Sequence, residues 1–162
     1  MSSPTRILLA TDGSCHALEA ARFAATLLDH EAVSQVTVVA VIRPFYLEPF
    51  GEPITNFPMP QSMYDQLTAA ARDAAQQAAA ATVAELGPLA GRAQVTIREG
   101  WPAEEILRLV EEERIDLVVL GSRGWDEARP AMLGGVAEQV LHGAPCTVLL
   151  TRPIRPEAQG DT

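Results

Sequence analysis

The 162-residue chain contains no lysine, so its positive side-chain charge rests on arginine. This absence excludes a Walker-A phosphate loop, Schiff-base catalysis and the lysine-dependent chemistry of receiver-type switches. Acidic residues outnumber Lys and Arg by 21 to 12, which gives a formal net charge of −9. Because phosphate neutralisation supplies most of the affinity for nucleic acids, this balance argues against a nucleic-acid partner.

Cysteines and long apolar runs are also scarce. The two cysteines, Cys15 and Cys146, lie far apart in the sequence, which is typical of a reduced intracellular protein. The apolar run after Arg6 is shorter than the core of a signal peptide, and no run approaches membrane-spanning length. We therefore expect a cytoplasmic protein without a membrane partner.

Catalytic and metal-binding patterns are missing as well. The sequence has no G-x-S-x-G elbow and no H-E-x-x-H pair. His16, His30 and His142 are isolated from other ligand residues at metal-binding spacing. We expect neither an enzyme nor a metal site. Cys15, near a helix start, is open to two interpretations, a redox-sensitive thiol or an ordinary helix residue, and the second is favoured.

Apolar and amphipathic stretches alternate along the chain. The patterns predict five strands, at Arg6–Thr11, Gln35–Ile42, Ala93–Glu99, Leu117–Leu120 and Thr147–Leu150. They predict four helices, after an N-cap at Ser14, over Gln61–Leu86, after Pro102 and after Gly134. Five prolines indicate a long loop over Arg43–Pro60. This strand–helix alternation predicts a parallel sheet with helices on both faces and a ligand site at the C-terminal strand ends.

Glycines mark the most informative segment, between the last two predicted strands. Gly121 ends one apolar run, Gly124 follows, and Gly134 and Gly135 open a helix. Glycine allows backbone N–H groups to approach an anion closely, and a helix start adds partial positive charge. The segment is therefore a candidate phosphate cradle.

Three stretches of the chain resemble the universal stress protein family: ILLATDGSCHALEAARFA, DLVVLGSRG and GGVAEQVLHGAPCTVLL. The spacing of Gly121, Gly124 and Gly134 is similar to the G-x2-G-x9-G pattern of the family's nucleotide-binding branch. The resemblance implies one α/β domain over residues 1–151, a doubly wound five-stranded parallel sheet of order 3-2-1-4-5, followed by a flexible tail at 152–162. It also implies a homodimer through the last strand, Cys146–Thr151.

The same resemblance implies a binding site for ATP, with or without Mg²⁺, or for another adenine nucleotide. The protein would then be a dimeric stress-response switch or adaptor. Asp12 would contact the ribose and adenine side, Val41 would line the adenine pocket, and the glycines would surround the phosphates. The implied site comprises Ala10, Thr11, Asp12, Val41, Leu120, Gly121, Arg123, Gly124, Gly134, Gly135 and Val136.

One position departs from the family pattern. Gly135 stands where the family has Ser or Thr, so the hydroxyl for a phosphate oxygen is missing, a loss of about 1.5–3 kcal/mol. A family member that binds no nucleotide, and acts through its dimer surface and Arg43–Pro60, is therefore an alternative. An ATP-cleaving enzyme of the α-hydrolase type is disfavoured, because that class has Ser-Gly-Gly after its first strand. Asp12 also has an alternative role, as a cap of the first helix.

Overall fold

The computed structural model describes residues 5–44, 59–122 and 133–152. Most of the predicted loop Arg43–Pro60 and nearly all of the predicted tail 152–162 lie outside these ranges. The division into a domain at 1–151 and a flexible tail therefore stays a prediction.

Five strands and four α-helices alternate along the described chain. The strands are β1 (Thr5–Ala10), β2 (Val33–Ile42), β3 (Ala93–Glu99), β4 (Leu117–Gly121) and β5 (Thr147–Thr151). The helices are α1 (Cys15–Leu27), α2 (Gln61–Ala84), α3 (Pro102–Glu112) and α4 (Gly135–Gly143), with a 3-10 helix η1 (Gly87–Arg92) before β3. All nine elements expected from the sequence are present.

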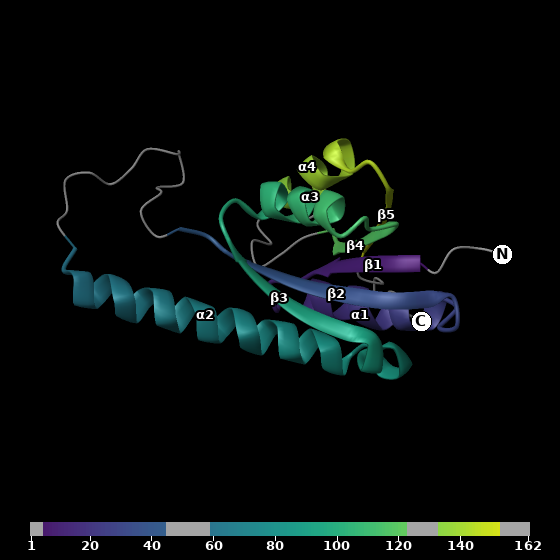
Figure 1. Ribbon diagram of the computed structural model, residues 1–162, viewed down its shortest axis with the longest axis horizontal. Coiled ribbons are helices and arrows are strands. Elements are labelled where there is room, and N and C mark those ends of the chain that lie inside the picture. Colours follow the sequence, from purple (N-terminus) through teal and green to yellow (C-terminus); the bar gives the residue numbers. More distant parts are fainter. Residues whose placement is uncertain (1–4, 45–58, 123–132, 153–162) are drawn as a thin grey trace, which may run out of the picture.

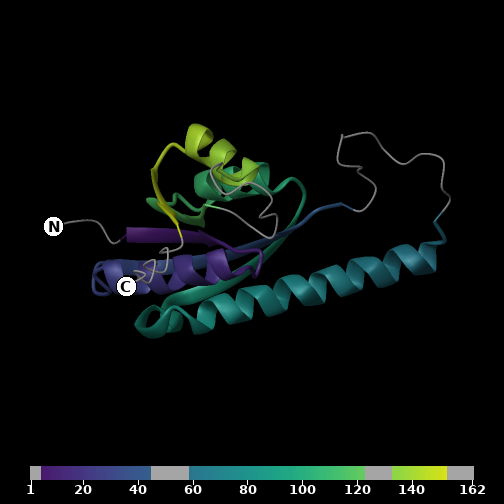
Figure 2. The same ribbon diagram turned by 180° about the vertical axis from the view of Figure 1, so that it is seen from behind.

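The strands form one parallel sheet in the order β3-β2-β1-β4-β5, which confirms the predicted fold class and topology. Helices α1 and α2 cover one face, and α3 and α4 cover the other, so the sheet is the middle of three layers (Figures 1 and 2). Strands β3 and β5 are the two edges of the sheet.

Alternate residues of the central strands serve the two faces. In β1, Ile7 and Leu9 pack into the core beneath α1 and α2, whereas Leu8 packs into the core beneath α3 and α4. All three side chains are buried. Burial on both faces explains why β1 and β2 have nearly continuous apolar sequences.

Several strand boundaries differ from the sequence prediction by one or two residues, and the end of α2 differs as well. The helix expected to reach Leu86 ends at Ala84, and a 3-10 helix that was not predicted follows it. Gly87 has φ 50°, a left-handed conformation that favours glycine and ends the α-helical run. Pro88 lies in the first turn of η1, where its missing N–H costs nothing.

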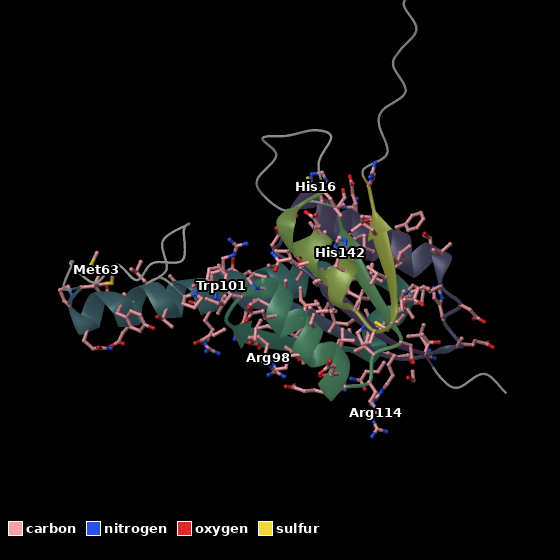
Figure 3. All side chains as sticks on the ribbon, turned by 90° about the horizontal axis from the view of Figure 1, so that it is seen from above. His16, Met63, Arg98, Trp101, Arg114 and His142 are labelled. Atoms are coloured by element: carbon pink, nitrogen blue, oxygen red, sulfur yellow. The ribbon has the colours of Figure 1, made fainter. Side chains whose placement is uncertain are left out.

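Helix α2 extends beyond the edge of the sheet. Its buried residues, Ala79 and Thr82, both lie in its C-terminal half. The N-terminal half projects away from the three layers, with the half-exposed Met63 near its end (Figure 3). The fully buried residues of α2 are therefore confined to the C-terminal half of the helix.

Candidate functional site

The turn between β1 and α1 is held by hydrogen bonds within itself and to β2. The backbone N–H of Thr11 donates to the Val39 carbonyl over 2.9 Å, which extends the sheet by one residue. Ser14 N donates to Asp12 Oδ1 over 2.9 Å, and Ala17 N donates to Ser14 Oγ over 3.3 Å. The predicted N-cap at Ser14 is confirmed. The carboxylate of Asp12 supports this turn, while Asp12 itself is exposed at the strand ends.

On the side of the turn that faces α2, the side chain of Thr11 contacts this helix. Thr11 Oγ1 accepts a hydrogen bond from Gly13 N over 3.1 Å and lies 2.7 Å from Thr82 Oγ1. Thr11 is 7% exposed and Thr82 is fully buried. The turn is thus fixed from below by a helix distant in sequence.

The end of β4 lies directly against the start of α1. A Cβ added to Gly121 would be 2.9 Å from the His16 carbonyl oxygen, which is closer than real side chains approach. The backbone N–H of Ser122 donates to Thr151 O over 2.8 Å, and its carbonyl accepts from Gly134 N over 2.9 Å. Buried Ser122 therefore links the end of β4 to both β5 and the start of α4.

Helix α4 begins without a side-chain cap. Gly134 is the N-cap, and no side-chain cap hydrogen bond forms there among the described residues. The first intrahelical bond runs from Glu138 N to Gly134 O, so the N–H groups of Gly135, Val136 and Ala137 precede it. A Cβ added to Gly135 would meet nothing within 4 Å. These groups suit an anion at the positive end of the helix.

Most of the predicted site residues lie at the C-terminal ends of the strands. Because β1 neighbours β2 and β4, the ends of these three strands are adjacent. Ala10 and Val41 pack on the side of α3 and α4, as does Val136. Leu120 is buried and offers its backbone alone. The residues brought to these strand ends are Ala10, Thr11, Asp12, Val41, Leu120, Gly121, Gly134, Gly135 and Val136; Arg123 and Gly124 lie outside the described residues.

Two supporting residues, Ser122 and Thr82, were not predicted. The signal for Ser122 is a polar residue between the apolar run of β4 and the glycines of the loop. Thr82 stands in an alanine-rich helix, and nothing local in the sequence indicates its contact with Thr11.

A pocket of about 280 Å³ opens beside the predicted site, between α2 and the ends of β2 and β3. It contains none of the predicted nucleotide residues. The hydroxyl of Thr68 is buried at this pocket and has no hydrogen-bond partner among the described residues. The lining consists of Ile42, Arg43, Pro44, Tyr64, Thr68, Glu99 and Gly100.

The two cysteines, Cys15 and Cys146, lie in different surroundings. Burial, together with the nearby Asp116, raises the pKa of the Cys146 thiol, which makes the thiolate scarcer. Cys15 is exposed at the start of α1. Among the described residues, no group of three or more His, Cys, Asp or Glu side chains is arranged to hold a metal ion.

The comparisons with known proteins agree with this architecture. The Universal stress protein family profile matches residues 4–152. The chain belongs to the universal stress protein family. A curated universal stress protein of Thermus aquaticus is 31% identical over 146 residues, which cover 90% of this chain and 97% of that protein. The predicted family membership is confirmed.

Solved structures of the family share the fold. The structure of the hypothetical protein MJ0577 of Methanocaldococcus jannaschii is 22% identical, with a TM-score of 0.76 and coverage of 96% of this chain and all of that one. A family member from Arabidopsis thaliana, solved with AMP bound, is 16% identical, with a TM-score of 0.65 and coverage of 96% and 97%. At these identities the similarity establishes the fold alone.

Within residues 5–44, 59–122 and 133–152, none of the helices has the length and apolar character to cross a bilayer.

Proposed function

We propose that this universal stress protein binds an adenine nucleotide at the C-terminal edge of its sheet and acts as a cytoplasmic stress-response switch or adaptor. The observation that carries the proposal is the start of α4, which has no side-chain cap among the described residues, at the same strand ends as the hydrogen-bonded turn at Asp12. Backbone N–H groups for an anion and an exposed carboxylate for hydroxyl groups lie at one edge. The AMP bound to the Arabidopsis relative supports an adenine ligand.

In the proposed complex, each part of the nucleotide has its own protein partner. The carboxylate of Asp12 accepts hydrogen bonds from ribose hydroxyls, and the backbone of Val41 lines the adenine. The phosphates lie against Gly121 and the N–H groups of Gly135 and Val136. Arg123 and Gly124 complete the phosphate side, as the family resemblance implies. The ligand is ATP, with or without Mg²⁺, or a related adenine nucleotide, and the role is binding rather than catalysis.

The proposed assembly is a homodimer through β5. This strand is an edge of the sheet, and its residues are only partly buried or exposed. An apolar edge strand is stabilised when another strand pairs with it, and two-fold pairing of Cys146–Thr151 provides this. Further apolar surface is supplied by exposed Phe23 and Leu27 on α1, which contacts β5, and by exposed Leu141 on α4, whose buried residues share a core cluster with β5.

A second function, protein contacts without nucleotide, is favoured by Gly135. The start of α4 offers backbone groups there but no hydroxyl. If this alternative holds, a substitution at Gly135, where a Cβ meets nothing within 4 Å, leaves the cellular role intact and the dimer surface carries it.

Calorimetric titration of nucleotide-stripped protein with ATP, with and without Mg²⁺, tests the proposal. We expect binding in the micromolar range for the wild type and a clear loss for Asp12→Asn. Asp73→Asn, an exposed carboxylate of α2, is the matched control and should bind like the wild type. Absence of binding at millimolar ATP would reject the nucleotide role in favour of the second function.

A further inference from the structure

Helix α2 meets the predicted binding turn at a buried polar contact between two threonine hydroxyls. Thr82 Oγ1 lies 2.7 Å from Thr11 Oγ1 and 2.8 Å from the Ala78 carbonyl oxygen. Thr11 Oγ1 in turn accepts from the backbone N–H of Gly13 over 3.1 Å. A continuous hydrogen-bonded chain thus runs from the turn, through two buried hydroxyls, into the backbone of α2.

Steric contact reinforces this polar link. Gly13 has φ 78°, and a Cβ added there would be 2.9 Å from the Cβ of Ala78. The backbone of the turn therefore rests directly on the same stretch of α2 that holds Thr82. A shift of this stretch cannot occur without a shift of Gly13 or loss of packing.

The other polar contacts that join α2 to the rest of the protein are weaker. Thr82 and Ala79 are its buried residues. The ion pairs Arg22–Glu85 and Arg72–Glu99 have exposed or partly exposed partners, and such pairs contribute little to stability. Loss of the Thr82 hydroxyl should consequently affect the turn more than any other polar change in α2.

We propose that Thr82 is a positioning residue for nucleotide binding, acting through Thr11 on the Asp12 turn. The proposal rests on the nucleotide role proposed above. The hydroxyl of Thr82 fixes Thr11 and Gly13, and this fixes the backbone that presents the Asp12 carboxylate to a ligand. Because coupling between two sites is reciprocal, a nucleotide at the turn also stabilises α2 against local opening.

Two substitutions of the same kind on the same helix test the proposal. Thr82→Val removes the hydroxyl that contacts Thr11, whereas Thr68→Val removes a hydroxyl without a partner among the described residues. We expect Thr82→Val to weaken ATP binding about three- to tenfold, the range for one lost hydrogen bond, and Thr68→Val to leave it unchanged. Thr82→Ser, which keeps the oxygen, should restore most of the affinity. Equal affinity of Thr82→Val and Thr68→Val would overturn the proposal.

Hydrogen exchange on the ligand-free proteins separates this proposal from the nucleotide role. The Gly13 amide should exchange about three- to tenfold faster in Thr82→Val than in Thr68→Val, with recovery in Thr82→Ser. This expectation holds whether or not the wild type binds ATP. A wild type without ATP binding but with faster exchange in Thr82→Val would reject the proposed function and leave the positioning link standing. Unchanged exchange at Gly13 would reject the link itself, also if ATP binds.

If the wild type and the two valine variants bind ATP, hydrogen exchange in α2 measures the effect in the opposite direction, from the nucleotide to the helix. Saturating ATP should slow exchange of the amides around Ala78 and Thr82 in the wild type and in Thr68→Val. The slowing should be smaller in Thr82→Val. Equal slowing in all three proteins would contradict the reciprocal part of the proposal.

Discussion

The two backbone segments that form the candidate site are built in opposite ways. The turn at Thr11–Ser14 supplies its own hydrogen-bond partners and rests on α2, so its shape is fixed without a ligand. The start of α4 has no side-chain cap among the described residues, and the space beside Gly135 is open. The sugar side of the proposed site is therefore preformed, whereas the phosphate side presents N–H groups that no side chain of the described residues caps.

The largest expected effect comes from crowding the contact between the end of β4 and the start of α1, which lies between the two segments. Gly121→Val should lower the free energy of unfolding by about 3 kcal/mol, because its side chain would overlap the His16 backbone. The same displacement of the α1 start should abolish nucleotide binding. Chemical denaturation and ATP titration measure the two effects. Gly91→Val is the control, since a Cβ there meets nothing within 4 Å, and an equal loss in both variants would contradict the explanation.

Adding the missing hydroxyl at the start of α4 should have the next largest effect. Gly135→Ser places a hydroxyl where the family pattern has one, and nothing lies within 4 Å of the new Cβ. A charge-assisted hydrogen bond of about 1.5–3 kcal/mol corresponds to an affinity for ATP about ten- to a hundredfold higher.

Gly135→Ala is the matched control for this change. Alanine fits the same open space and favours the helix, but it adds no donor or acceptor. We expect it to raise thermal stability while ATP affinity stays at the wild-type value. Equal gains in affinity for Ser and Ala would show that helix stability, not the hydroxyl, limits binding.

The preformed turn should tolerate change less well than its exposure suggests. Gly13→Ala forces an L-residue to φ 78° and brings its Cβ to 2.9 Å from that of Ala78. The left-handed conformation alone costs about 1–2 kcal/mol, measurable by denaturation. A double-mutant cycle with Ala78→Gly isolates the contact from the backbone strain, and an interaction energy of zero would mean that α2 does not press on the turn.

Local sequence patterns were sufficient for the five strands and the four α-helices, because these depend on apolar periodicity and on capping and turn residues, whereas the strand order in the sheet came from the family resemblance. Ser14 was identifiable as a cap from its place before an amphipathic run, and parallel order follows from strand–helix alternation. The glycine spacing and the first turn indicated which strand ends form the candidate site.

The supports of the site could not be predicted in this way. The contact of Thr82 with Thr11 depends on how α2 lies across the sheet, and no periodic signal encodes that. The 3-10 helix Gly87–Arg92 lies beyond the predicted helix end at Leu86, and no apolar periodicity indicated it; Gly87, with φ 50°, turns the chain toward β3. The ligand roles of the site residues, and the contributions of Arg123 and Gly124, stay predictions.

The smallest expected effect concerns the ion pair between Glu85, at the C-terminal end of α2, and Arg22 of α1. The hydrogen bond from Arg22, over 2.6 Å, lowers the pKa of Glu85. A carboxylate whose pKa is lowered on folding stabilises the protein above its unfolded pKa, and the gain is lost as pH falls through the folded pKa. Glu85→Gln should therefore lower the thermal midpoint slightly near pH 7, and the difference from wild type should vanish on the acid side.

Because the pair is solvent-exposed, added salt should also reduce the difference. Glu111→Gln on the exposed side of α3 is the control, and a pH-independent deficit for Glu85→Gln would show that its packing, not its charge, holds the two helices together.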